Sequence, residues 1–303
     1  MTVVSTAAFF ERANLQLGGL RRKAESDQAQ IASGSRLVKS SDDPVAAARL
    51  RALARQESLA SVDQRNSDGA ASQLQQASSA LSQMSDLTIR ARELALQAGS
   101  QTLSIADRAS IGDELASLRD ALVDLAASRD GFGKALFGGE LSGKAYQPSG
   151  NGAAYLGTAQ PASVDLGDGQ VVEVSLTGPD VFNFTSNGTP TDLFSAIGDL
   201  AAALQGGASN GASLASGAID AIDGGLGKLT TAQTVVGTRL TWIDTLDQRR
   251  TERSETIAQE RADVGGVDLA SAITRLQQTV TVLEASQASF VKLANLSLFS
   301  QLR

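Results

Sequence analysis

Apolar residues near both ends of the chain recur alternately three and four positions apart, which is the spacing of a heptad seam between paired helices. The N-terminal stripe consists of Phe10, Ala13, Leu17, Leu20, Ala24, Asp27, Ile31, Gly34 and Val38. The C-terminal stripe consists of Leu269, Ile273, Leu276, Val280, Leu283, Gln287, Phe290 and Ala294. Two seams of similar length at opposite ends of one chain predict that the terminal helices pair with each other.

The first stripe is interrupted by the sequence Lys-Ser-Ser-Asp-Asp-Pro at 39–44. Asp43 is suited to cap a helix and Pro44 to occupy its first turn. These residues predict a second helix from 45 to about 99, and a further stripe over 111–125 predicts a third. The longest internal seam spans 219–243, and Val-Gly-Gly at 264–266 separates it from the terminal helix.

The middle of the chain has a different pattern. Glycines are too dense for a helix between 131 and 157. The segments 164–166 and 171–176 flank Gly-Asp-Gly, which predicts a β-hairpin. Thr191 or Asp192 then begins a short helix that contains Leu193 and Leu204. The fold class predicted is mainly α with a small β-rich insert, in an elongated rod of long antiparallel coiled-coil helices whose N- and C-terminal helices pair at one end.

This order also predicts a domain division. Residues 1–40 and 265–303 form a terminal coiled-coil domain, 41–130 and 205–264 form a helical rod, and 131–204 form an insert that points outward.

Composition narrows the classes of function. The 303 residues include no cysteine and no histidine, and the net charge is −7. These counts exclude disulfides, Cys/His metal sites and thiol or Ser-His-Asp chemistry, and the charge argues against a nucleic-acid partner. No apolar stretch is long enough to insert into a membrane, and residues 1–20 lack the features of a cleaved secretion signal. An enzyme would have to use carboxylates such as Asp165, Asp168 and Asp180, but aspartates beside glycines are usually turn formers. We therefore expect no enzyme activity and no cofactor.

Several motifs resemble the flagellin family. The segment 30–37, Gln-Ile-Ala-Ser-Gly-Ser-Arg-Leu, followed by Asp42, Asp43 and Pro44, resembles its N-terminal signature. Ile-Arg-Ala-Arg-Glu-Leu-Ala-Leu-Gln at 89–97 resembles its rod motif, and Val-Gly-Thr-Arg-Leu at 236–240 its returning rod helix. The segments 283–290 and 296–299 resemble its terminal helix. Proline after the paired aspartates is typical of the hook-associated branch at the hook–filament junction, whereas filament flagellins usually carry alanine there.

The resemblance implies a structural subunit of the bacterial flagellum that acts as an adaptor between hook and filament. It implies extracellular location after type III export in an unfolded state, without a cleaved signal peptide, and assembly through the terminal helices. The expected partners are the hook-side adaptor, filament flagellin, copies of itself and an export chaperone. The expected assembly interface contains Leu17, Leu20, Ile31, Ile273, Leu276, Val280, Leu283 and Phe290.

Two alternatives stay open at this point. The chain could be a filament flagellin that polymerises by itself, or a generic coiled-coil scaffold, against which the β-rich insert and the two helix breaks count. The rod motif adds a separate hypothesis. Arg90, Leu94 and Glu114 match the pattern that the animal Toll-like receptor for flagellin recognises, although they could equally be ordinary surface residues of the rod.

Overall fold

The computed structural model describes residues 6–301, with side chains for 8 and 10–292. Ala294 of the predicted seam and the 296–299 part of the terminal motif have side chains outside this range. The helices are α1 (Thr6–Ser33), α2 (Pro44–Ala98), α3 (Ile105–Ala126), α4 (Gly178–Phe182), α5 (Leu193–Gln205), α6 (Gly211–Gly265) and α7 (Leu269–Gln301). The strands are β1 (Tyr146–Ser149), β2 (Gly152–Tyr155), β3 (Ser163–Asp165), β4 (Val171–Glu173), β5 (Asn183–Ser186) and β6 (Thr189–Asp192).

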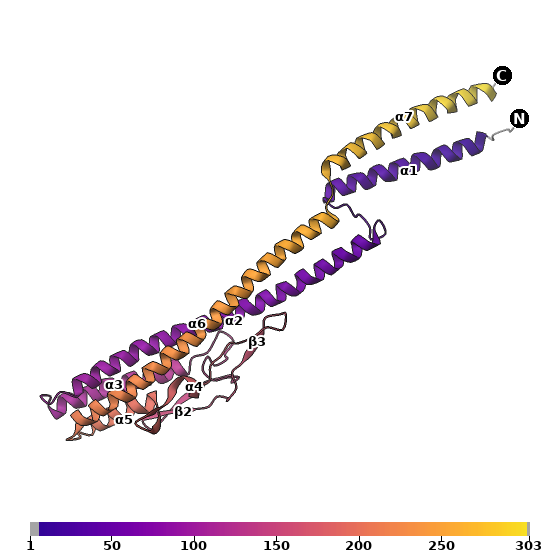
Figure 1. Ribbon diagram of the computed structural model, residues 1–303. Coiled ribbons are helices and arrows are strands. Elements are labelled where there is room, and N and C mark those ends of the chain that lie inside the picture. The colour runs from indigo at the N-terminus through magenta and orange to yellow at the C-terminus, as the bar shows by residue number, and fades with distance from the viewer. Residues whose placement is uncertain (1–5, 302–303) are drawn as a thin grey trace. The chain divides into compact units, whose positions relative to one another are not determined.

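The chain divides into two compact units. One comprises residues up to 59 and from 252 onward, and the other comprises 60–251. The first unit holds α1, α7, the beginning of α2 and the end of α6, and Figure 1 shows α1 and α7 side by side and antiparallel. Ion pairs also join α2 to α6 within this unit, between Arg49 and Glu260 at 2.5 Å and between Arg261 and Glu57.

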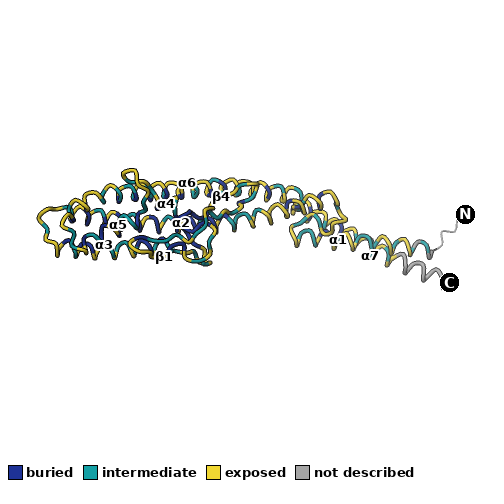
Figure 2. The backbone as a smooth tube through the Cα atoms, turned by 90° about the horizontal axis from the view of Figure 1, so that it is seen from below, coloured by how far each residue is buried: buried dark blue, intermediate teal, exposed yellow. Residues whose placement is uncertain are grey.

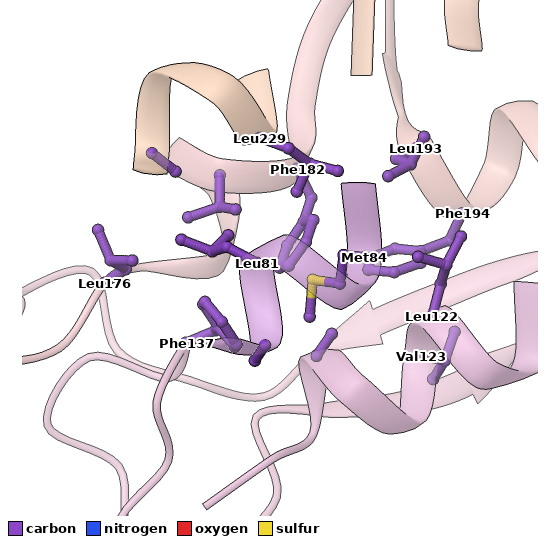
Figure 3. Close-up of a cluster of buried hydrophobic side chains, with 14 of the residues drawn as sticks. Leu81, Met84, Leu122, Val123, Phe137, Leu176, Phe182, Leu193, Phe194 and Leu229 are labelled. Atoms are coloured by element: carbon purple, nitrogen blue, oxygen red, sulfur yellow. The ribbon is translucent and has the colours of Figure 1, made fainter. Parts of the chain in front are cut away.

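The second unit has a continuous hydrophobic core. Leu81 and Met84 of α2, Leu122 of α3 and Leu229 of α6 are completely buried in it. Figure 3 shows these side chains meeting Phe137, Phe182 and Phe194, which come from the segment between α3 and α6. In Figure 2 the buried residues are concentrated in this unit, where α2, α3 and α5 run beside α6, whereas α1 and α7 are mostly half-buried or exposed.

The strands form three separate antiparallel hairpins, β1–β2, β3–β4 and β5–β6. The predicted hairpin at 164–176 is present as β3–β4, with Val164 opposite Val172. Its turn needs positive φ at three consecutive residues, Gly167, Asp168 and Gly169, which explains the glycines on both sides of the aspartate. The hairpin rests on the rod helices, because Asn66 of α2 and Arg250 of α6 donate to its Asp165 and Leu166 carbonyls at 2.9 and 2.8 Å.

The mainly α fold with a small β-rich insert is confirmed, and the predicted helix boundaries agree closely with the structure. The three-part domain division stays a prediction. The insert at 131–204 shares one core with the rod helices, since apolar side chains from both lie in a single cluster. Periodicity could not reveal this, because it reports which residues of an element are buried but not what covers them.

Candidate assembly interface

The pair formed by α1 and α7 is packed lightly. Among its described side chains only Asp27, Ala272 and Thr279 are fully buried, and two of these are polar. At the other end of the pair Phe10 and Phe290 meet edge to face, with ring centroids 5.3 Å apart. A helix pair gains most of its stability from burying apolar side chains, so this pair is weakly stabilised by its own contacts.

The predicted seam residues occupy two different positions on the pair. Those that are half-buried are Leu17, Leu20, Ile31, Leu276, Leu283 and Phe290. Ile273 and Val280, in contrast, are 44% and 37% exposed. On α7 the residues turned toward α1 are their neighbours Ala272 and Thr279, so the face in contact is rotated by one residue from the seam that the sequence suggests.

The exposed surface of α7 includes large apolar side chains among uncharged polar ones and carries little charge. Leu269, Val282 and Val291 are at least half exposed, and they lie on the same helix as the exposed Ile273 and Val280. Only three residues of α7 are charged: Arg275, Glu284 and Lys292. Beside it an open groove of 370 Å³ lies between the two helices, lined by Leu17, Leu20 and Phe290 among others. Depletion of charge around exposed apolar residues is typical of a surface that another protein covers.

The connection between α1 and α2 is bonded to the connection between α6 and α7. Gly34 ends α1 with φ of +68°, a conformation that favours glycine. Ser35 then bridges to Gly266, and the Arg36 amide donates to the Gly265 carbonyl at 2.8 Å. The Arg36 guanidinium reaches the Val264 carbonyl at 3.1 Å and Asp43 at 3.2 Å. The family-like segment at 30–37 thus holds the two helix breaks together.

The two adjacent aspartates, Asp42 and Asp43, make different hydrogen bonds. Asp42 accepts hydrogen bonds from the amides of Val38 and Lys39, at 3.1 and 2.8 Å, and so closes the turn. Asp43 accepts from the Ala46 amide at 3.0 Å and caps α2, with Pro44 as the first helical residue, as the sequence predicts. This backbone hydrogen bond, together with the hydrogen bond and charge of Arg36, lowers the pKa of Asp43 below its usual value of 3.8.

Comparison with known proteins shows which proteins the chain resembles. Residues 4–141 match the family model of the bacterial flagellin N-terminal helical region. Flagellar hook-associated protein 3 of Escherichia coli K12 is 28% identical over 286 residues, which cover 89% of this chain and 90% of that protein. The chain thus resembles the flagellin family in its N-terminal helices and flagellar hook-associated protein 3 over most of its length.

Solved structures of flagellar proteins share the fold. FlgL of Xanthomonas campestris superposes with a TM-score of 0.61 at 19% identity, covering 69% of this chain and 99% of that one. The flagellar junction protein FlgL of Legionella pneumophila gives a TM-score of 0.59 at 17% identity, covering 72% and 99%. At such low identity these likenesses establish the fold alone.

The segment that resembles the flagellin rod motif is only partly on the surface. Arg90 binds Glu114 of α3 at 2.8 Å and Glu93 at 3.2 Å, and these hydrogen bonds raise the pKa of the guanidinium. Leu94 is 2% exposed and packs into the core. A receptor could therefore contact Arg90 and Glu114 directly, but it could reach Leu94 only after the rod had rearranged. Recognition by the receptor stays a prediction.

The carboxylates weighed as catalytic candidates have structural partners. Asp165 accepts from the Gly167 amide at 2.8 Å in the hairpin turn, and Asp180 accepts from the Thr177 hydroxyl at the start of α4. In the described part of the chain, no group of three or more Asp or Glu side chains is placed to hold a metal ion. None of the described helices has the length and apolar character needed to cross a membrane.

Proposed function

We propose that this chain is a member of the flagellin family and the adaptor between the flagellar hook and the filament. Support comes from the two curated relatives, both named flagellar hook-associated protein 3, whose likeness extends over nearly the whole chain. It also comes from Pro44, which follows the paired aspartates at the start of α2. The family is a structural one, and the adaptor role requires no catalysis.

The proposed mechanism of assembly rests on one observation: on the α1–α7 pair polar side chains are buried while large apolar side chains are exposed. The buried positions of the pair include a carboxylate and a hydroxyl, while five large apolar side chains of α7 are exposed. These side chains are about half exposed, so covering one of them contributes about 0.7–1.5 kcal/mol, half of the value for burying it entirely. The pair therefore has more to gain from contacts with other subunits than from its own. We infer that the predicted interface residues assemble in two ways, with Leu276, Leu283 and Phe290 joining the pair and Ile273 and Val280 facing neighbours.

The partners follow from this position. On the hook side the chain meets the hook-side adaptor, laterally it meets copies of itself, and beyond it lies filament flagellin. Before assembly the exposed apolar side chains of α7 need protection, which an export chaperone provides. The protein reaches the extracellular flagellum by type III export.

An assembly experiment distinguishes the adaptor from a filament flagellin. The purified chain is incubated alone and with isolated hooks that carry the hook-side adaptor, and both samples are examined by sedimentation and electron microscopy. The adaptor should stay soluble alone and bind only at hook ends. Long filaments grown from the chain alone would identify a filament flagellin. No binding to hooks, and no restoration of filaments in a strain that lacks its own junction protein, would contradict the proposal.

A further inference from the structure

A carboxylate is buried in the contact between the terminal helices. Asp27 of α1 is 6% exposed, and the nearest cation is Arg275 of α7, whose Nε lies 3.7 Å from Asp27 Oδ1. The second oxygen, Oδ2, is buried and accepts no hydrogen bond. Arg275 itself is half exposed and donates to Gln30 Oε1 at 3.5 Å. Burial with incomplete pairing contributes little to stability, so another reason for an acid at this position is needed.

We propose that Asp27 and Arg275 set the register in which α1 and α7 pair. The proposal rests on the pairing of these two helices and not on the place of the protein in the flagellum. In paired helices a single buried polar residue can select one alignment at the expense of stability.

The apolar pattern alone leaves the alignment open. Leu276, Leu283 and Phe290 repeat every seven residues, so sliding α7 by one heptad, about 10 Å, replaces one large apolar side chain by another. In the slip that brings Asp268 to the position of Arg275, the aromatic contact at the far end becomes a contact between Phe10 and Leu283, which is still apolar. Hydrophobic contact therefore discriminates poorly between the native alignment and its neighbours.

Asp27 removes this ambiguity. A slip of one heptad brings either Asp268 or Val282 to the position of Arg275. With Asp268 two carboxylates would face each other, and with Val282 the buried charge would have no cation beside it. Both outcomes are costly in a site screened from water. Only the native alignment places a guanidinium there.

The bonds between the helix connections are the competing explanation for the register. Ser35 bridges to Gly266, and the Val267 amide donates to the Gly34 carbonyl at 3.1 Å. If these contacts alone fixed the alignment, changing Asp27 would not alter it. The two explanations therefore predict different results for variants at this one position.

Because the 303 residues include no cysteine, disulfide trapping in this chain is a direct test. Phe10 and Phe290 are in contact, so a chain with Phe10→Cys and Phe290→Cys reports the native register. Leu283 is seven residues before Phe290, so Phe10→Cys with Leu283→Cys reports the slip that places Asp268 opposite position 27. Initial rates of intrachain disulfide formation are measured for both pairs under one oxidant.

With Asp27 present, the native pair should form its disulfide about tenfold faster or more. Asp27→Leu should reduce this preference to about threefold or less, because the slipped alignments no longer bury a carboxylate. Asp27→Arg should reverse it, since the new arginine would repel Arg275 but attract Asp268 in the slipped register. Asp27→Glu, which keeps the charge, should retain the native preference.

Three results would overturn the proposal. They are equal rates for the two pairs with Asp27 present, an unchanged native preference in both Asp27→Leu and Asp27→Arg, or no disulfide in either pair. The second result would assign the register to the bonds between the connections. None of these results bears on binding to hook ends, so failure here is distinguishable from failure of the adaptor role.

Discussion

Replacing Phe182 by alanine tests whether the β-rich insert and the rod helices share one core. Phe182 is completely buried, and its ring lies 4.9 Å from Phe194, 5.4 Å from Tyr146 and 5.7 Å from Phe137, measured between centroids. Truncation of a buried phenylalanine costs about 3–5 kcal/mol. Three aromatic contacts are lost at once, so a value near the upper end is expected.

Urea unfolding measures this loss with two signals. Far-UV circular dichroism follows the helices, and the fluorescence of Trp242, the single tryptophan, follows α6 in the second unit. A loss of about 4 kcal/mol with a slope near 2 kcal/mol per molar urea lowers the midpoint by about 2 M. Because α2, α3 and α6 contribute to the same core, the fluorescence midpoint should fall together with the main loss of helix.

Phe132→Ala is the matched control. Its side chain is 93% exposed, so its removal should change the free energy of unfolding by less than about 0.5 kcal/mol. If Phe182→Ala left both the fluorescence and the helix transitions where they are in the unmodified chain, the reasoning would be refuted. The insert would then be a separate domain, as the sequence alone suggested.

Four further predictions address the assembly surface, the helix cap, the ends of the chain and the rod motif. Replacing both Leu276 and Leu283 with Ala should abolish incorporation into flagella, measured by motility and by blotting of sheared flagella, while the Trp242 unfolding transition stays unchanged; full incorporation would show that α7 is not the assembly element. The pKa of Asp43 is lower in the folded chain than its usual value of 3.8, so the ionised cap stabilises the fold above pH 3.8 and this stabilisation is lost as pH falls through the folded pKa. Asp43→Asn should remove this part of the pH dependence of stability. The measurement is the unfolding midpoint between pH 2 and 6, roughly the range in which a carboxyl titrates. Trypsin should cut the free chain early near Arg22 and Arg275, because the ends at 1–40 and 265–303 are expected to be mobile before assembly. Timed mass spectrometry that shows equal resistance to trypsin along the whole chain would contradict this. If the receptor for flagellin recognises the rod motif, reporter cells should respond to the purified chain and lose the response with Arg90→Ala; no response to the unmodified chain would retire the hypothesis.

Much of the fold is determined locally and was therefore readable from the sequence. Asp43 and Pro44 start α2 because a side-chain acceptor and a fixed φ are needed at those two positions, whatever surrounds them. Asp192 starts α5 in the same way, by accepting from the Ser195 amide at 2.9 Å. Gly34 ends α1, and Gly-Asp-Gly forms the β3–β4 turn, because their backbone conformations favour glycine.

The face that α7 turns toward α1 was decided only by the tertiary structure. Alternating steps of three and four residues allow two overlapping stripes that share Leu276, Leu283 and Phe290. One stripe adds Ile273 and Val280, and the other adds Ala272 and Thr279. The sequence favours the first because it is more apolar, but α1 packs on the second, where smaller side chains permit close approach.

Packing between segments far apart in the sequence also decided how the core of the second unit is completed and how Asp27 is paired. A buried phenylalanine such as Phe182 signals a core but does not say which helices complete it. In the sequence Asp27 only interrupts an apolar heptad stripe, and its pairing with Arg275 is visible only in the folded structure. Capping and turn formation depend on a few neighbouring residues, so one sequence determines them. The pairing of surfaces depends on residues some 250 positions apart along the chain in the case of Asp27 and Arg275, and only the folded structure brings them together.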